Sequence, residues 1–331
     1  MSVQVIAEIG VNHDGDLSKA KKLIDVAASA GADFVKFQTF DVRLLASPLA
    51  PTARYQRSTT NTKSQFELLS RLSLSRAETE SLWNYAQLKG IKFLSTPFDL
   101  ESASFLVDLG VEALKIGSGE LTNLPFLAGL KQLGKPLLLS TGMGSLEEIK
   151  VAAHLLRDVD LILFHCTSLY PAPPETLNMR ALLTMKQTFG FEIGYSDHSI
   201  GSTAAIIAVA YGASWVEKHI TLSKADRGPD HRASMEPEEF NHFVNSVKIV
   251  NTMLGDGVKS PAPGEYETAA VARRSIVYRK NLDRGHRIEL NDIEFLRPAT
   301  GICASKYESV LGRQTVKPCS AGQLVNWSDL I

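Results

Sequence analysis

The sequence predicts an α/β fold in which eight consecutive strand–helix units close into a (β/α)8 TIM barrel, followed by a small, mostly β domain. Short runs of β-forming residues alternate eight times with segments of helical period. Each right-handed crossover returns the chain in the same direction, so eight parallel strands are expected. The alternation stops at about Gly255, where short β-rich runs broken by turn residues begin. Eight units in a segment of this size are typical of such a barrel.

The expected strands are residues 3–10, 33–40, 91–98, 113–120, 136–142, 161–171, 191–199 and 214–222. Each precedes a segment of helical period, and several of these segments end in glycine, the usual residue just past a helix. An open, doubly wound sheet is the alternative. It ranks below the barrel because no G-x-G-x-x-G motif follows any of these strands. In a barrel, functional groups lie at the C-terminal ends of the strands, where this sequence has its polar residues.

Composition divides the chain into three expected parts: a catalytic barrel over 1–255, a linker with Pro and Gly over 256–271, and a small β domain over 272–331. The last part carries 10 Lys and Arg against 6 Asp and Glu. A basic domain beside a more acidic barrel is consistent with a lid over a site for acidic substrates.

The bulk composition is that of a soluble globular protein. The chain has 331 residues, 44% hydrophobic and 21% charged, with a formal net charge of −1, so nothing indicates a nucleic-acid or membrane partner. Three widely spaced cysteines, Cys166, Cys303 and Cys319, form neither a disulfide framework nor a CxxC motif. The N-terminus lacks the features of a signal peptide, and no run is long enough for a membrane span. A cytoplasmic location is therefore expected.

Two lysines are expected to point into the mouth of the barrel. In DFVKFQTF, alternation puts Lys36 and Gln38 on one face, and in ALKIGSGE Lys115 opposes its branched neighbours. Buried lysines are unfavourable unless paired, so two on strand ends indicate an anionic ligand. The alternative is that each lysine pairs with a carboxylate such as Glu8 or Glu120.

Hydroxyl groups recur at the same level of the expected barrel, at Thr96, Ser118, Ser140 and Ser196. Singly, each is more typical of a helix N-cap. Four hydroxyls around one mouth with two lysines would form a cradle of charge-assisted hydrogen bonds for a phosphate group.

Two histidines end consecutive expected strands and are candidate metal ligands. His198 follows Asp197 in IGYSDHS, and His219 lies two residues after Glu217 in WVEKHIT. Neighbouring strands lie roughly 4.8 Å apart, so the two imidazoles can reach one divalent ion and leave positions open for water and substrate oxygens. A single strand-end histidine is more often a structural, hydrogen-bonded residue.

An ordered series of short motifs resembles the sialic acid synthase family, which comprises N-acetylneuraminate synthase and its legionaminate, pseudaminate and spore-coat polysaccharide relatives. The matching stretches are AEIGVNHDGD, VKFQTF, FLSTPF, KIGSGE, LSTGM, CTSLYPAP, GYSDHS, EKHIT and GPDHRASMEPEEF. In the tail, RRSIVYRKNLDRGHRIELNDIEFLRPATGI resembles the antifreeze-like (SAF) domain of the family. The resemblance runs in order from about residue 5 to the C-terminus.

The resemblance implies a transferase that condenses phosphoenolpyruvate with an unphosphorylated N-acylmannosamine-type aldose, giving a nine-carbon 2-keto acid and phosphate. N-acetylneuraminate synthase is the preferred interpretation, with legionaminate or pseudaminate synthase as the alternative. A divalent metal is implied, manganese first and magnesium or cobalt otherwise. A domain-swapped homodimer is also implied, in which Arg297 of one subunit lies over the barrel of the other.

The resemblance also implies roles for individual residues. Those that match the phosphoenolpyruvate-binding positions are Lys36, Thr96, Lys115, Ser118, Ser140 and Ser196. Those that match positions around the metal-bound water and the sugar are Glu8, Gln38, Glu120, Tyr170 and Asp230, with Glu8 and Glu120 as candidate general acids or bases. His198 and His219 match the metal ligands. Ser168 stands where some members have asparagine, so its contact with the sugar is the least supported.

Two other functions are compatible with parts of the pattern. A Schiff-base aldolase would use Lys36 or Lys115 as a nucleophile, but it leaves the histidine pair and the hydroxyls without a role. A non-catalytic sugar-binding barrel is the second alternative, and it gives no reason for so many polar strand ends. His13 and His165 are further strand-end histidines that keep the choice of metal ligands open, and Asp197 could support a ligand or cap a loop.

Overall fold

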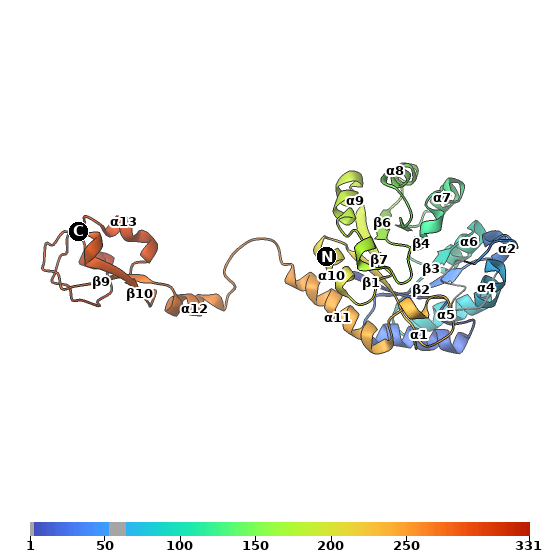
Figure 1. Cartoon of the computed structure of the whole chain (residues 1–331), viewed down its shortest axis with the longest axis horizontal. Coiled ribbons are helices and arrows are strands. Elements are labelled where there is room, and N and C mark those ends of the chain that lie inside the picture. The colour runs from blue at the N-terminus through green and yellow to red at the C-terminus, as the bar shows by residue number, and fades with distance from the viewer. Residues whose placement is uncertain (1–2, 53–63) are drawn as a thin grey trace. The chain divides into compact units, whose positions relative to one another are not determined.

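Eight parallel strands form the first of two units into which the chain divides, Met1–Gly255 and Asp256–Ile331. The structure is a computed structural model that describes residues 3–52 and 64–331. The strands are β1 (Gln4–Gly10), β2 (Phe34–Thr39), β3 (Lys92–Pro97), β4 (Leu114–Ile116), β5 (Leu137–Ser140), β6 (Leu161–Cys166), β7 (Glu192–Asp197) and β8 (Trp215–His219) (Figure 1). The predicted eight-unit α/β barrel is therefore confirmed.

The strand order is β3-β2-β1-β8-β7-β6-β5-β4, and each hydrogen-bonded neighbour is parallel. The two end strands, β3 and β4, lie side by side without a backbone ladder among the described residues. The barrel thus closes at a seam between β3 and β4. β4 is shorter than predicted because the chain turns at Gly117 into the 3-10 helix η1 (Ser118–Glu120).

One α-helix follows each strand in the barrel pattern. These helices are α1 (Leu17–Ser29), α5 (Arg76–Leu88), α6 (Leu100–Leu109), α7 (Leu124–Lys131), α8 (Leu146–Leu155), α9 (Ala181–Phe189), α10 (Thr203–Ala210) and α11 (Pro237–Met253). The long β2–β3 connection adds α2 (Val42–Leu45) and α4 (Gln65–Leu72). None of the helices described here is long and apolar enough to cross a membrane.

Local sequence signals explain where the helices begin and end. Ser75 and Ser145 each form a capping box with the glutamate three residues on, which satisfies free N–H groups in the first turns of α5 and α8. Helices α6 and α9 end at Gly110 and Gly190, which adopt the left-handed conformation that glycine tolerates best.

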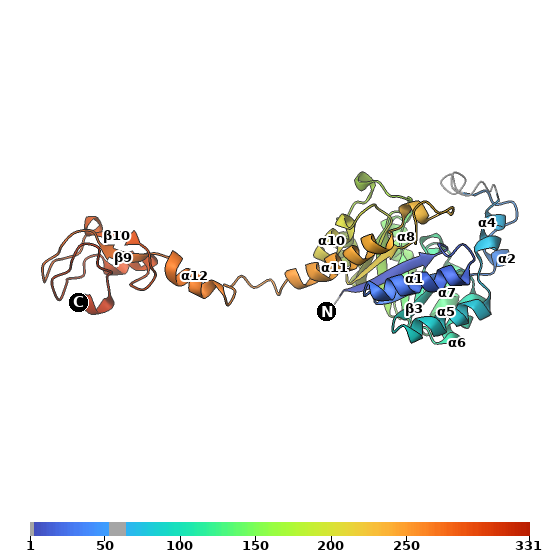
Figure 2. The same cartoon turned by 90° about the horizontal axis from the view of Figure 1, so that it is seen from below.

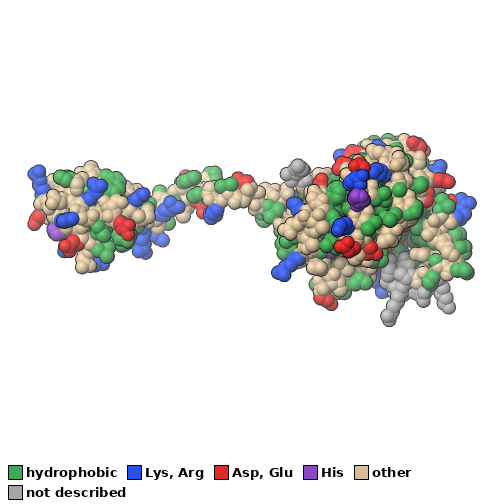
Figure 3. Space-filling model, turned by 90° about the horizontal axis from the view of Figure 1, so that it is seen from above, with side chains coloured by type: hydrophobic (Ala, Val, Ile, Leu, Met, Phe, Trp, Pro, Cys, Tyr) green, Lys and Arg blue, Asp and Glu red, His purple; other side chains and the backbone are tan. Residues whose placement is uncertain are grey.

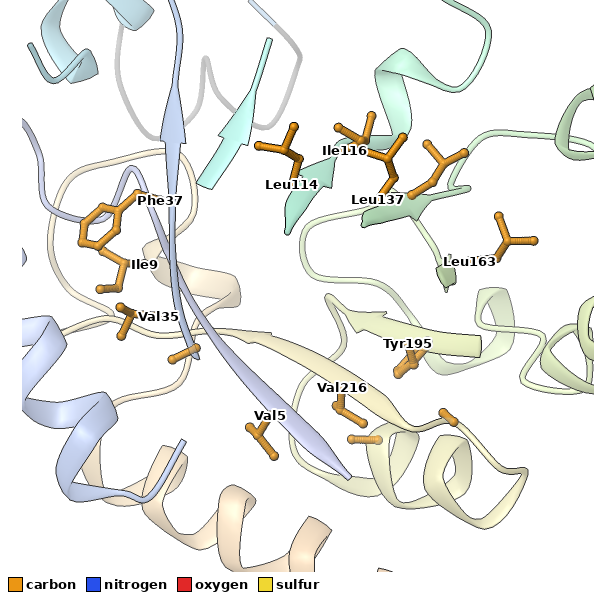
Figure 4. Close-up of a cluster of buried hydrophobic side chains, with 14 of the residues drawn as sticks. Val5, Ile9, Val35, Phe37, Leu114, Ile116, Leu137, Leu163, Tyr195 and Val216 are labelled. Carbon is orange, nitrogen blue, oxygen red and sulfur yellow. The ribbon is translucent and has the colours of Figure 1, made fainter. Parts of the chain in front are cut away.

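Alternation along the strands separates two apolar layers. Side chains that face the helices form the main core, and Figure 4 shows ten of them labelled on successive strands, among them Val35, Ile116 and Val216. Side chains of the opposite parity fill the barrel interior in a second cluster: Ile6, Phe34, Leu94, Ala113, Leu138, Ile162 and Phe164, with Trp215 against it. The next inward-facing position on each strand lies closer to the C-terminal ends than this interior cluster does. The interior cluster therefore forms the floor of the site.

The second unit is small and built around one antiparallel pair, β9 (Ser275–Tyr278) and β10 (Ile293–Leu296), as Figures 1 and 2 show. Short bridges and turns surround a separate apolar core that includes Ile276, Ile288 and Val325. A short helix, α13 (Tyr307–Val310), completes it. The segment expected as a linker contains a helix, α12 (Glu265–Ala272). Lys and Arg side chains are spread over the face of this unit visible in Figure 3.

Candidate active site

A cavity of about 520 Å³ lies at the C-terminal ends of the barrel strands. Thirteen of the fifteen residues predicted for the site line it, and they are Glu8, Lys36, Gln38, Thr96, Lys115, Ser118, Ser140, Ser168, Tyr170, Ser196, His198, His219 and Asp230. They come from all eight strands or the loops that follow them. The cavity thus brings together residues that are more than two hundred positions apart in the sequence.

Two predicted residues do not line this cavity. Glu120 ends the 3-10 helix η1, where its Oε2 accepts a hydrogen bond from Asn123 Nδ2 at 2.7 Å. Arg297 directly follows β10 in the second unit. Its role over a barrel remains a prediction.

Lys36 is buried in the cavity wall with a carboxylate beside it. Its Nζ lies 2.8 Å from Glu8 Oε2 and donates to Thr96 Oγ1 at 3.0 Å. Pairing with Glu8 is the alternative that the sequence left open, and it occurs. Burial alone would lower the pKa of Lys36, but Glu217 and Glu8 raise it above its ordinary value.

Lys115 lies within ion-pair distance of a second buried carboxylate, Glu217. Lys115 Nζ and Lys36 Nζ each lie 3.8 Å from Glu217 Oε2, and Ser196 Oγ donates to Glu217 Oε1 at 2.8 Å. Lys115 also hydrogen-bonds Ser140. Sequence reasoning noted Glu217 only as an acidic neighbour of His219. The signal was present, because residues two apart on a strand share a face.

The two carboxyl groups have opposite electrostatic surroundings. Burial raises the pKa of Glu8 to about 7, although Lys36 opposes it. Burial also acts to raise the pKa of Glu217, but Lys115 and Lys36 together lower it to about 2. Burial also lowers the pKa of Lys115 from its ordinary value, although Glu217 opposes this. Below about pH 7 the two lysines therefore face one ionised glutamate, Glu217, and one that holds its proton, Glu8.

Gly142 lies where three polar side chains converge. A Cβ at this position would lie 2.4 Å from Ser168 Oγ, 2.7 Å from Cys166 Sγ and 2.9 Å from Ser118 Oγ. The Gly142 N–H donates to Ser118 Oγ at 3.0 Å, and Ser118 Oγ lies 3.1 Å from Cys166 Sγ. Only glycine leaves this corner of the cavity open, a feature that sequence reasoning missed.

His198 and His219 face one another with ring centroids 5.4 Å apart. The ring of Tyr170 lies 4.2 Å from that of His198. His198 Nδ1 lies 2.8 Å from the Thr167 carbonyl oxygen. This oxygen can only accept a hydrogen bond, so Nδ1 carries the hydrogen and donates it, and Nε2 of the neutral ring keeps its lone pair. His219 Nδ1 is buried and has no hydrogen-bond partner among the described residues.

These two histidines fit a divalent metal. Burial lowers the pKa of both imidazoles, well below the ordinary value for His219, so both are neutral near pH 7, as metal ligands must be. His13 and His165 do not line the cavity. Their ring nitrogens bond the Gly15 N–H and the Leu177 carbonyl oxygen instead.

Asp197 points away from the cavity and pairs with Lys218. Lys218 Nζ lies 2.9 Å from Asp197 Oδ2, and both side chains are almost fully buried. Asp197 Oδ1 also accepts from the Ser199 N–H and Oγ, and Lys218 donates to the carbonyl oxygens of Ser199 and Gly201. The pair joins the ends of β7 and β8 directly beside His198 and His219.

A second group of possible metal ligands lies outside the cavity lining. Ligand atoms of Asp14, Asp226 and His231 all lie within 4.8 Å of one another. Lys19 Nζ lies 2.5 Å from Asp14 Oδ2 and 2.6 Å from Asp226 Oδ2. This ammonium contacts both carboxylates and offsets one of their two negative charges, so the chain itself supplies a positive charge where a metal ion would bind.

Comparison with known proteins identifies the family. Residues 23–259 match the NeuB family and residues 273–331 match the SAF domain. The N,N'-diacetyllegionaminic acid synthase of Campylobacter jejuni is 42% identical, with 97% of this chain and 98% of that protein covered. The protein of the same name from Legionella pneumophila is 41% identical, with 100% of this chain and 95% of that protein covered.

A solved structure shows the same likeness. The crystal structure of N-acetylneuraminic acid synthetase from Leptospira borgpetersenii, in complex with citrate, is 34% identical, with a TM-score of 0.71 over 81% of this chain and 90% of that chain. These matches confirm the resemblance inferred from the short motifs. The chain therefore belongs to the NeuB family of sialic-type acid synthases and carries a SAF domain.

Proposed function

We propose that the chain condenses phosphoenolpyruvate with an unphosphorylated, N-acylated six-carbon aldose and releases a nine-carbon 2-keto acid and phosphate. The observation that carries this proposal is the pair of buried lysines, Lys36 and Lys115, set among hydroxyl groups that line one cavity. Their positive charge and fixed donors suit a small, multiply charged anion, whose carboxylate and phosphate oxygens accept hydrogen bonds.

In the proposed reaction, C3 of phosphoenolpyruvate forms a bond to the aldehyde carbon of the open-chain sugar. The aldehyde oxygen takes up a proton and becomes a hydroxyl group. Water then adds at C2 and loses one proton. The resulting C2 hydroxyl loses its remaining proton as the C2–O bond to phosphate breaks, which leaves the keto group and releases phosphate. The anion would be bound and oriented by Lys36, Thr96, Lys115, Ser118, Ser140 and Ser196. Glu8, whose pKa of about 7 allows it to hold or release a proton near neutral pH, is the candidate acid or base.

The metal proposed here is a divalent cation held by His198 and His219. It would supply a positive charge for the aldehyde oxygen, and manganese is preferred, with magnesium or cobalt as alternatives. Asp230, Tyr170, Gln38 and Ser168 lie on the cavity wall and are proposed to contact the sugar. Burial raises the pKa of Asp230 to about 6, so its carboxylate is ionised at neutral pH and can accept hydrogen bonds from sugar hydroxyls.

The sugar is proposed to be a 2,4-diacetamido aldose of the legionaminic type, in place of the N-acetylneuraminate precursor that the sequence favoured. Two relatives more than 40% identical over nearly the whole chain are named for N,N'-diacetyllegionaminic acid. Part of the cavity wall is also apolar, formed by Val11, Leu45, Leu68, Leu69 and Leu72. Such a wall suits acyl methyl groups better than hydroxyl groups.

The test is phosphate release from phosphoenolpyruvate with manganese and a panel of aldoses, with product mass measured in parallel. We expect kcat/KM for the 2,4-diacetamido aldose to exceed that for N-acetylmannosamine about tenfold or more, and a chelator to abolish turnover. Sugar binding without turnover for any aldose would favour a binding protein. Borohydride trapping on Lys36 or Lys115, with activity that survives the chelator, would favour a Schiff-base aldolase.

A further inference from the structure

The loop after β1 holds the loop after β8, on which Asp230 lies. Asn12 Nδ2 donates to the Ile220 carbonyl oxygen and to Ser234 Oγ, both at 2.8 Å. Ser234 Oγ in turn donates to the Asp230 carbonyl oxygen at 2.7 Å. Asn12 is fully buried and Ser234 nearly so. The backbone of Asp230 is thus fixed, through one intermediate hydroxyl, by a residue of the first loop.

A second connection between the same loops lies one residue beyond Asp230. His231 Nε2 is 3.1 Å from Asp14 Oδ1, and its Nδ1 is 2.7 Å from Thr221 Oγ1. A carboxylate only accepts, so the ring N–H donates to Asp14. Lys19 holds Asp14 and Asp226 together from the other side. We call Asn12, Asp14, Lys19, Asp226, His231 and Ser234 the clasp.

Two glycines in these loops lie too close to their neighbours for a Cβ: Gly228 lies against the clasp itself, and Gly15 lies against α4. A Cβ at Gly228 would lie 2.6 Å from His231 Cδ2 and 3.1 Å from Asp14 Oδ1. Gly15 has a φ of 76°, and a Cβ there would lie 2.7 Å from the Arg71 carbonyl oxygen. Asp14 itself has a φ of 54°, a conformation that Asp, Asn and Gly tolerate best. The contact between the loops therefore depends on the local backbone as well as on hydrogen bonds.

We propose that Asn12, Asp14 and His231 are positioning residues that fix Asp230 at the cavity wall and thereby control use of the aldose. This proposal rests on the function proposed above. The anion-binding lysines and hydroxyls make no contact with the clasp in the hydrogen bonds and ion pairs of the described residues. Loosening the clasp should therefore affect the sugar and spare phosphoenolpyruvate.

The variant Asp14→Asn tests this, because asparagine keeps an acceptor oxygen and tolerates positive φ but removes the charge. We expect KM for the aldose to rise about tenfold, with KM for phosphoenolpyruvate changed less than about twofold. In an Asp230→Asn background, the same substitution should add less than about twofold, since its effect acts through Asp230. An equal rise in both KM values, or effects that multiply in the double variant, would overturn the proposal.

Asp158→Asn is the matched control, because it also removes a carboxylate that pairs with a lysine, Lys131, at 2.9 Å, on the barrel surface. It should leave both KM values unchanged. Hydrogen exchange gives a readout that does not depend on turnover: Asp14→Asn should speed exchange over residues 221–236, and Asp158→Asn should not. Unchanged exchange over 221–236 would contradict the clasp, whereas a wild-type chain that turns over no aldose would contradict only the proposed function.

Discussion

Glu8 and Glu217 lie on adjacent strands and face the same lysine, yet they have opposite acidities. Burial raises the pKa of Glu8 to about 7, because its main counter-charge is Lys36 alone. Glu217 is buried as deeply, but it lies between Lys115 and Lys36 and receives a hydrogen bond from Ser196, so its pKa is about 2. A glutamate can thus gain or lose a proton near neutral pH at position 8, whereas at position 217 it stays ionised.

The difference predicts how Glu8 affects stability with pH. The pKa of Glu8 in the folded chain lies above its ordinary value of 4.5, so between pH 4.5 and 7 the unfolded chain ionises first and the free energy of unfolding falls as pH rises. The contribution is about 3 kcal/mol at most. Urea unfolding of the metal-free chain across this range should show a shallower fall for Glu8→Gln than for the wild type.

The control for this experiment is again Asp158→Asn. A hydrogen bond from Lys131 holds the pKa of Asp158 below its ordinary value, so this group is ionised in both states throughout the range. The free energy of unfolding of Asp158→Asn should therefore change with pH in the same way as that of the wild type. If Glu8→Gln also runs parallel, Glu8 does not hold a proton up to pH 7.

Much of the site could be predicted at the level of residues, and the limits are physical. Strand alternation placed Lys36 and Lys115 in the cavity, since parity depends only on neighbours in the sequence. It could not show that Lys36 pairs with Glu8 and that Glu217 serves both lysines, because those distances depend on the register between strands. The role of Gly142 was hidden for the same reason: the three side chains that crowd it come from other strands or loops.

Strands β7 and β8 have their cavity-lining residues on one face and a buried ion pair on the other. Ser196, His198, Glu217 and His219 line the cavity, while the buried pair of Asp197 and Lys218 joins the strand ends outside it. The sequence left the role of Asp197 open between ligand support and a cap. The structure shows a loop cap and an ion pair together, because Asp197 also accepts from Ser199.

This arrangement predicts that Asp197→Asn lowers the free energy of unfolding by about 3 kcal/mol, because Lys218 would keep a buried charge without its counter-ion. The double variant Asp197→Leu with Lys218→Met should lose much less free energy of unfolding than the sum of the losses in Asp197→Leu and Lys218→Met alone. Urea unfolding of the wild type, these two single variants and the double variant measures the coupling. Additive losses would show that the two side chains act independently.

At the scale of the whole molecule, the eightfold repeat was enough to predict a barrel, because consecutive right-handed strand–helix units have few other ways to bury their strands. The short ladder of β4 and the seam between β3 and β4 were not predictable, since both follow from the turn at Gly117 and from closure of the sheet. The small domain was recognised from its motifs. Its short strands and bridges carry little periodicity of their own.

The proposed homodimer makes a prediction that only two chains together can test. We propose that Arg297 of one chain completes the barrel of the other, so Arg297→Ala and Lys115→Ala remove different halves of each site. If the two variants are co-expressed at equal levels, half of the dimers are mixed, and each mixed dimer has one site with an intact barrel and an intact Arg297. Activity should therefore return to about a quarter of the wild-type value. Dimers purified through two different tags should show half of the wild-type activity per dimer. An Arg297 that acts on its own barrel would give no recovery in either preparation, because every intact barrel would then carry the alanine.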